Sequence, residues 1–113
     1  MIVRTWRGTT RAADADAYLD YLRESGLAAY QATPGNRGAA VLRRVADGEA
    51  EFLVVSAWDG EAAVRAFAGD DLLRAVFYPE DDRFLVQRDL AVAHYDLVYR
   101  AAAPAPADAA RAR

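Results

Sequence analysis

The sequence predicts a small α+β domain with the ferredoxin-like order β-α-β-β-α-β, in which two helices cover one face of a four-stranded antiparallel sheet. Three observations predict this fold class. The N-terminal residues alternate between two faces, an Asp47-Gly48 hairpin signal separates two aliphatic runs, and the second run ends at Trp58 and continues directly into an amphipathic helix. A chain of 113 residues is long enough for one such domain and its core.

Residues 2–7 alternate as a two-faced strand does, and we expect the first strand there. Thr9 or Thr10 is expected to cap the following helix through its hydroxyl group. Apolar residues at helical spacing predict that helix over about residues 11–25. The sequence Thr-Pro-Gly-Asn at residues 33–36 marks the loop that follows.

Residues 38–45 and 51–58 are rich in aliphatic and β-branched side chains, so we expect them to pair as an antiparallel hairpin. Asp59 is the predicted N-cap of the second helix, and Gly69 is its predicted stop. One face of the resulting sheet has no helix to cover it. A second copy of the chain would cover that face, and we therefore expect a homodimer.

The last third of the domain is predicted to hold a short helix over residues 71–77, a short extended piece at 83–87 and a final strand at 91–99. The domain is expected to span residues 1–100. Residues 101–113 are rich in alanine and proline and offer no large apolar side chain, so they are expected to form a disordered tail.

Composition excludes several classes of function. The net charge is −3 with both signs interspersed, so we expect no nucleic-acid partner. The chain has no cysteine and one histidine, which excludes thiolate chemistry and a multi-histidine metal site within one protomer. No apolar run approaches the roughly 20 residues that span a bilayer, and no apolar segment opens the chain. We expect no membrane partner and a cytoplasmic location.

His94 is the only side chain whose ordinary pKa lies near neutrality, so it is the candidate general acid or base. The alternative is a strand histidine that is hydrogen-bonded or solvated near a subunit interface. Arg4 and Trp6 share one face of the first strand, where a guanidinium would bind an anionic or enolate oxygen beside a flat ring. The alternative is a core tryptophan beside an arginine in an ion pair.

Two further aromatic residues are candidates for the wall of a pocket. Tyr78 stands where the chain leaves its predicted helix, and a packing role is the alternative. Trp58 either lines a pocket or anchors the turn from strand to helix. The acidic run at residues 80–82, next to Arg83, is typical of a solvated turn, so we predict no metal site. Residues 35–38 lack the strand-to-helix context of a dinucleotide loop.

Four segments of this chain are similar to the antibiotic biosynthesis monooxygenase family of dimeric α/β barrels. They are Val-Arg-Thr-Trp at residues 3–6, Thr-Pro-Gly-Asn-Arg-Gly at 33–38, Phe-Leu-Val-Val-Ser-Ala-Trp at 52–58 and His-Tyr-Asp-Leu-Val at 94–98. The resemblance covers about residues 2–99. It implies a homodimer whose two sheets build a barrel. Family members include quinone-forming oxygenases without a cofactor, haem degraders and small-molecule isomerases.

The haem-degrading branch of that family carries an asparagine on its first strand, a tryptophan in its second helix and a haem-ligating histidine farther along. This chain departs from the pattern at all three places. Its asparagine is Asn36 in a loop, the helix position is Phe67, and Phe77 or Tyr78 stands near the histidine position. The resemblance therefore implies no tightly bound cofactor, with haem and flavin left open.

The resemblance implies a cofactor-independent monooxygenase that acts on a small aromatic or polyketide-like metabolite in a cavity of the dimeric barrel. In this reading His94 is the base and Arg4 stabilises developing oxyanion charge. The expected substrate-binding residues are Trp6, Trp58, Phe67 and Tyr78. The alternatives are a non-catalytic small-molecule-binding dimer of the same fold, a structural or regulatory dimer with a filled cavity, and a haem-binding or haem-degrading protein.

Overall fold

The structure is a computed structural model and describes residues 1–104 of the chain. One antiparallel sheet forms the centre of the domain, with the strand order β2-β3-β1-β4, and β5 also pairs with β1. The strands are β1 (Ile2–Arg11), β2 (Asn36–Ala46), β3 (Glu49–Trp58), β4 (Leu85–Arg88) and β5 (Ala93–Asp96). Since β4 pairs with the second half of β1 and β5 with the first half, the two together fill the fourth position of the predicted sheet.

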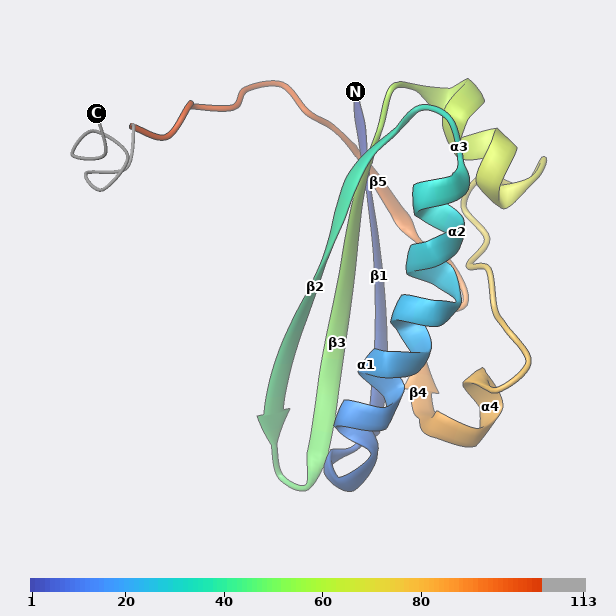
Figure 1. Cartoon of the computed structure of the whole chain (residues 1–113), viewed down its shortest axis with the longest axis vertical. Coiled ribbons are helices and arrows are strands. Elements are labelled where there is room, and N and C mark those ends of the chain that lie inside the picture. Colours follow the sequence, from blue (N-terminus) through green and yellow to red (C-terminus); the bar gives the residue numbers. More distant parts are fainter. Residues whose placement is uncertain (105–113) are drawn as a thin grey trace.

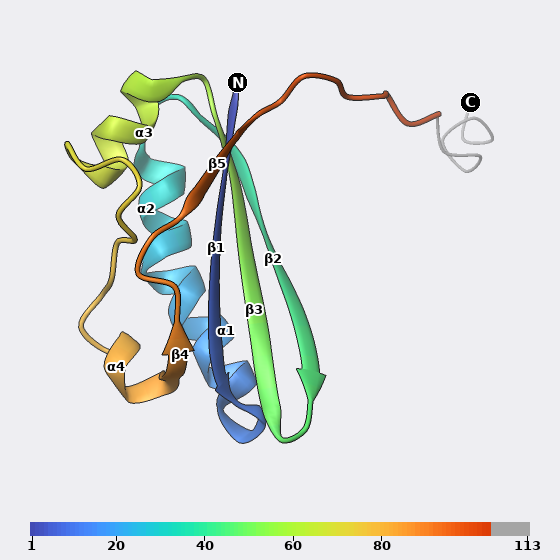
Figure 2. The same cartoon turned by 180° about the vertical axis from the view of Figure 1, so that it is seen from behind.

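Helices cover one face of this sheet (Figures 1 and 2). They are α1 (Ala15–Glu24), α2 (Gly26–Ala32), α3 (Glu61–Ala68) and the single turn α4 (Asp81–Phe84), with a 3₁₀ turn at Ala12–Asp14 before α1. α1 and α2 run along the sheet almost as one helix and break at Ser25. The predicted α+β fold with its antiparallel sheet is confirmed. No helix within residues 1–104 is long and apolar enough to cross a membrane.

The core lies between the sheet and the helices. Alternate side chains of β3 point into it, and Phe52 and Trp58 are both fully buried there. Tyr18 of α1 packs edge to face on Phe52, with ring centroids 5.0 Å apart. Val64 of α3 is also fully buried. Aromatic contacts between helix and strand therefore hold the helical layer in place.

The first strand is longer than predicted and the cap of the first helix lies elsewhere. β1 continues to Arg11, so both threonines are strand residues. Thr10 is fully buried and donates its hydroxyl to the carbonyl of Arg11, and it caps no helix. The N-cap of α1 is Asp14. The prediction of a threonine cap was wrong because β-branched threonine fits the pleated strand and here completes the pairing with β3.

The predicted helix at residues 71–77 does not form, and the chain between Gly69 and Glu80 has no regular helix or strand. Tertiary partners take its backbone groups instead. The N–H of Ala75 donates to the carbonyl of Leu90, and the carbonyl of Leu73 accepts from the N–H of Val92. These bonds replace the i to i+4 bonds of a helix, so the segment lies as an irregular cover over the sheet and helices.

The predicted boundaries differ at two other places. Asp59 makes no capping hydrogen bond to α3 and instead forms an ion pair with Arg37 at 2.5 Å. Gly69 does end α3, in a left-handed conformation with φ 83°. The predicted final strand is shorter than expected, since β5 covers only residues 93–96. Residues 101–104 are exposed and irregular, and the rest of the predicted tail lies outside the described residues.

The other face of the sheet carries no helix formed by residues 1–104 (Figure 2). Register places Val3 opposite Tyr95, and Leu42 opposite Leu53, with all four side chains on this open face. Leu42 and Tyr95 are both more than half exposed. The bare apolar face predicted from the strand pattern is therefore present in the protomer.

Candidate functional site

A cavity of about 40 Å³ lies on the helix-covered side of the sheet and is partly open to solvent. Its walls come from β1 and β3 on one side, α1, α2 and α3 on the other, and the irregular segment 69–80. The cavity thus lies within one protomer, between sheet and helices. The sequence predicted a different place for the cavity, between the uncovered sheet faces of two subunits in the dimeric barrel.

Arg4 supplies a buried positive charge to this cavity. Only 3% of the residue is exposed. Its Nη1 donates to the carbonyl of Leu72 at 2.6 Å, and its Nη2 donates to the carbonyl of Arg74 at 3.0 Å. No carboxylate within residues 1–104 forms an ion pair with it, and burial lowers its pKa. The alternative of an ion-paired arginine therefore does not describe Arg4 in this part of the chain.

His94 contacts Arg4 and does not line the cavity. The two residues lie opposite each other on β5 and β1, and Nη1 of Arg4 is 3.0 Å from Nε2 of His94. A guanidinium only donates hydrogen bonds, so Nε2 accepts this bond and the ring proton is assigned to Nδ1. Burial, and secondarily the charge of Arg4, lower the pKa of His94. The structure thus brings the two predicted catalytic residues together, with Arg4 on the cavity side.

Trp6 forms part of the cavity wall next to Arg4 on β1. Its indole Nε1 donates to the carbonyl of Asp89 at 2.8 Å, and its ring packs edge to face on Phe77. The indole lies over Gly8, where an added Cβ would be 2.3 Å from a ring carbon. A glycine is therefore required beneath this tryptophan to keep the ring flat against the strand.

Phe67 of α3 lines the cavity, whereas Trp58 does not. Trp58 is fully buried, donates its indole N–H to Ser56 at 2.9 Å, and stacks on Phe67 with centroids 5.6 Å apart. The rings of Phe67 and Tyr30 also pack edge to face. Trp58 thus supports the wall from behind, which is the anchoring alternative, and Tyr30 is a wall residue that the sequence reading did not single out.

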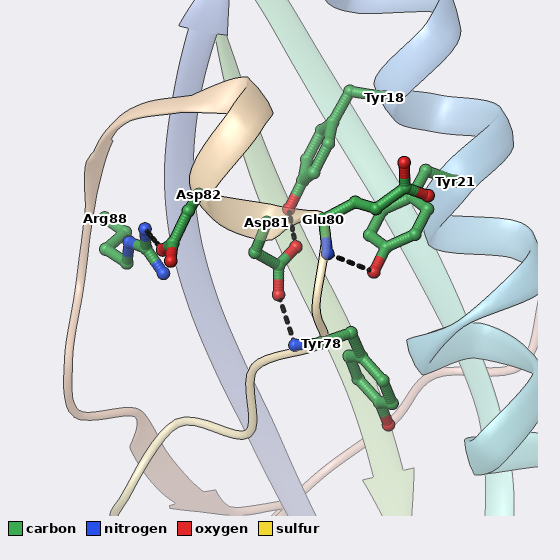
Figure 3. Close-up of polar contacts among 7 residues, drawn as sticks. All are labelled: Tyr18, Tyr21, Tyr78, Glu80, Asp81, Asp82 and Arg88. Carbon is green, nitrogen blue, oxygen red and sulfur yellow. Dashed lines mark hydrogen bonds and ion pairs between the residues drawn. The ribbon is translucent and has the colours of Figure 1, made fainter.

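Tyr78 lines the cavity beside a buried carboxyl group that the sequence reading placed in a solvated turn. Asp81 is only 4% exposed, and its Oδ2 accepts the backbone N–H of Tyr78 at 2.7 Å. Its Oδ1 accepts the hydroxyl of Tyr18 at 3.5 Å (Figure 3). No local pattern indicated this burial, because Tyr78 lies outside the single turn α4 and helical spacing does not relate it to Asp81.

The neighbours of Asp81 in the acidic run do behave as turn residues. Asp82 is exposed and pairs with Arg88, and Glu80 pairs with Arg83 at 3.0 Å. Within residues 1–104, no three histidine or acidic side chains are grouped so as to hold a metal ion.

The geometry does not fit a haem group. Within residues 1–104, the cavity wall contains no histidine, cysteine or methionine that could ligate the iron. Tyr78 stands near the position of the haem-ligating histidine in the family and is the candidate iron ligand. Burial and the nearby Tyr30 and Asp81 raise the pKa of Tyr78. A raised pKa disfavours the tyrosinate form that ligates haem iron.

Several solved structures have a fold similar to that of this chain. A Bacillus cereus protein named as a putative antibiotic biosynthesis monooxygenase superposes with a TM-score of 0.66 at 18% identity, over 93% of this chain and 98% of that one. A protein of the same name from Nitrosomonas europaea gives 0.60 at 15% identity, over 88% and 100%. The Mycobacterium tuberculosis haem degrader MhuD, with two haems in its active site, gives 0.57 at 20% identity, over 90% and 100%.

No protein-family model matches the chain, and no curated protein matches it. The structural matches cover nearly the whole of each chain, so this protein has the fold of the antibiotic biosynthesis monooxygenase structures. The predicted resemblance is confirmed at the level of the fold.

Proposed function

We propose that this protein is a cofactor-independent monooxygenase that acts on a small, flat aromatic or polyketide-like metabolite. The observation that carries the proposal is the buried guanidinium of Arg4, which is paired with no carboxylate of residues 1–104 and stands in an aromatic cavity wall. Three of its five N–H donors have protein partners at 2.6–3.0 Å, and the hydroxyl of Tyr30 in the cavity wall is a further partner, whose place a ligand oxygen would take.

Arg4 is suited to hold a phenolate or enolate oxygen. In a dry site a fixed positive charge stabilises an oxyanion far more than it does in water. Trp6 and Phe67 offer flat apolar surfaces on either side of that charge. A conjugated carbanion or phenolate held there is electron-rich enough to react with oxygen directly, so the protein needs only to form, desolvate and position it.

The substrate must enter by displacing part of the wall. An apolar cavity that holds benzene has about 150 Å³, several times the space present here. The segment 69–80 has no regular structure and forms one wall, so we propose its outward movement as the entry route, which would break its hydrogen bonds to Arg4, Leu90 and Val92.

The test uses 1,8-dihydroxyanthrone as the substrate. Its ring methylene becomes a carbonyl, one oxygen atom of O₂ enters the product, and the other leaves as water. We expect oxygen uptake above the spontaneous rate, with a loss of about 10²–10³-fold in kcat for Arg4→Gln. Arg23→Gln is the control, because Arg23 is exposed on α1, away from the open sheet face, and does not line the cavity. Equal oxygen uptake with and without protein would refute the proposal.

A non-catalytic binding protein is the second candidate, and the position of His94 favours it. The Nε2 of His94 is occupied by Arg4 and the ring does not line the cavity, so the predicted base has no direct path to a ligand. Such a protein would bind 1,8-dihydroxyanthrone under nitrogen without oxygen uptake in air. His94→Ala would then reduce binding only slightly.

We also propose that the working unit is a homodimer, joined through the open face of the sheet. Val3, Leu42, Leu53 and Val55 place apolar surface there, and no helix covers it in the protomer. Native mass spectrometry at micromolar concentration should give the mass of two chains. A monomer under those conditions would refute this arrangement.

A further inference from the structure

Among residues 1–104, Asp81 is the only acidic residue in the cavity wall, since the other lining residues are apolar, aromatic or, at Arg4, basic. It lies at the first position of α4 and is almost fully buried. Its two oxygens accept the hydroxyl of Tyr18 and the N–H of Tyr78, whereas an asparagine could accept only one of these bonds. Within residues 1–104 no basic side chain forms an ion pair with Asp81, and a buried carboxylate without such a partner in a cavity wall is a candidate for a chemical role.

The carboxylate has unused hydrogen-bonding capacity toward the cavity. A carboxylate offers about four lone-pair positions, and two are occupied here. The bond from Tyr78 to Oδ2 is short at 2.7 Å, whereas the hydroxyl of Tyr18 is 3.5 Å from Oδ1, at the outer limit of a hydrogen bond. Oδ1 is consequently the atom that can take a proton from a ligand.

Asp81 and Arg4 lie at opposite ends of the cavity. Arg4 is paired in register with Ser56 on β3. Tyr18, which contacts Asp81, packs on Phe52, four residues farther along the same strand. Four strand residues correspond to about 13 Å between these two positions of the backbone. Arg4 is also not among the charged groups that shift the pKa of Asp81, as expected for two groups that do not touch each other. A flat conjugated molecule in the cavity can therefore contact one group at each end.

We propose that Asp81 is the general base of this cavity and takes a proton from the end of the substrate opposite the oxygen that Arg4 holds. This inference rests on the function proposed above. In an anthrone the methylene carbon and the carbonyl oxygen lie at opposite ends of the central ring. The C–H bond breaks, its proton goes to Oδ1 of Asp81, and its electron pair passes through the ring to the carbonyl oxygen, which becomes an oxyanion at Arg4.

The surroundings of Asp81 adjust its basicity. Burial raises the pKa of the carboxyl group, and Asp82 also raises it. The backbone N–H of Tyr78, the charge of Arg88 and the hydroxyl of Tyr18 act in the other direction. Tyr21 lies nearby, but its hydroxyl oxygen accepts the backbone N–H of Glu80 and does not contact Asp81 (Figure 3). The net upward shift makes Asp81 a stronger base than an exposed aspartate.

The experiment follows proton transfer without oxygen. Anthrone is dissolved in D₂O under nitrogen with each protein, and deuterium entry at its methylene carbon is measured by NMR. We expect the wild type to accelerate exchange and Asp81→Asn to lose about 10²–10⁴-fold of that acceleration. Glu80→Gln is the matched control, since it removes a neighbouring exposed carboxylate that does not contribute to the pKa shift of Asp81, and it should stay within about twofold of the wild type.

The outcomes separate this inference from the proposed function. Exchange that survives in Asp81→Asn, or no acceleration by the wild type, overturns the role of Asp81, whatever the oxygen-uptake assay gives. Exchange that depends on Asp81 without oxygen uptake supports the base and refutes the monooxygenase.

Tyr18→Phe provides a second variant that keeps the carboxyl group. Loss of the Tyr18 hydroxyl removes a bond that lowers the pKa of Asp81, so the acid limb of the exchange rate should move to higher pH. An unmoved limb would contradict the assignment even if Asp81→Asn fails to fold.

Discussion

Arg4 and His94 form a pair in which the arginine donates and the imidazole accepts. We therefore propose that His94 positions Arg4, whereas the sequence predicted that it is the base. A neutral imidazole acceptor fixes one edge of the guanidinium, while the carbonyls of Leu72 and Arg74 fix the other donors. Together they aim the remaining donors of Arg4 at the cavity.

If His94 acts as an acceptor, an amide should replace it. We expect His94→Gln to keep most of the turnover of 1,8-dihydroxyanthrone, because its side-chain oxygen also accepts from Arg4. His94→Ala should lose about tenfold, which corresponds to one lost hydrogen bond to a charged group. Steady-state kinetics of both variants measures this. Equal, complete loss in both would restore His94 as the base.

The stability of the protein should also report on this histidine. Burial and Arg4 lower the folded-state pKa of His94 below 6.5, so the unfolded chain binds its proton first as pH falls. The stability that His94 contributes is therefore full above pH 6.5 and is lost as pH falls through the folded-state pKa. Urea unfolding of the wild type and His94→Gln across that window should show a difference that shrinks toward low pH.

The contact between Gly8 and Trp6 is the second residue-scale test. An alanine Cβ at position 8 would overlap the indole, so we expect Gly8→Ala to destabilise the fold by about 1–3 kcal/mol and to shift the Trp6 indole N–H signal. Gly60→Ala is the control, because a Cβ there meets nothing within 4 Å. Chemical unfolding and NMR give both readouts, and an unchanged indole signal would contradict the packing.

At the scale of elements, the sequence predicted best where side-chain pattern alone decides structure. The strand ending at Trp58 and the hairpin around Asp47 and Gly48 follow from alternation and turn chemistry. The segment 69–80 could not be predicted this way. Its backbone bonds go to Arg4 and to residues 90 and 92, partners that no local pattern reveals.

In the candidate site too, some residues follow from a local sequence pattern and others depend on tertiary packing. Arg4 and Trp6 were found because strand alternation places both on one face. Asp81 was missed because an acidic run next to an arginine is usually solvated. Only the packing of α4 turns Asp81, the middle residue of the run 80–82, toward the core. Burial of a single residue within a charged run is a tertiary property.

The start of α2 offers an element-scale prediction. Gly26 is its first residue, and an added Cβ would lie 3.7 Å from the ring of Tyr78, an ordinary contact. We expect Gly26→Ala to stabilise the fold by about 0.4–1 kcal/mol through the unfolded chain, and to weaken binding of 1,8-dihydroxyanthrone by narrowing the cavity. Thermal unfolding and a binding titration should move in opposite directions. If Gly26→Ala raised both the stability and the affinity for 1,8-dihydroxyanthrone, the ligand would have to bind outside this cavity.

At the scale of the whole molecule, the open sheet face predicts an association that single substitutions can break. Leu42→Glu should convert the proposed dimer to monomers, because it buries a charge in an apolar interface. Leu73→Glu is the control, since Leu73 is 53% exposed against 54% for Leu42 but lies in the segment 69–80, away from that face. Native mass spectrometry distinguishes them, and a Leu42→Glu dimer would refute the interface.

The hydrogen bonds from Arg4 to the carbonyls of Leu72 and Arg74 have a consequence for how the cavity fills. The same cation that would recognise a ligand oxygen also holds down the segment that closes the cavity. A ligand that draws the guanidinium toward itself therefore weakens the closure at the moment of recognition. We therefore expect entry and recognition to be linked, so that molecules of the right shape that lack an oxygen acceptor for Arg4 enter more slowly than those that carry one.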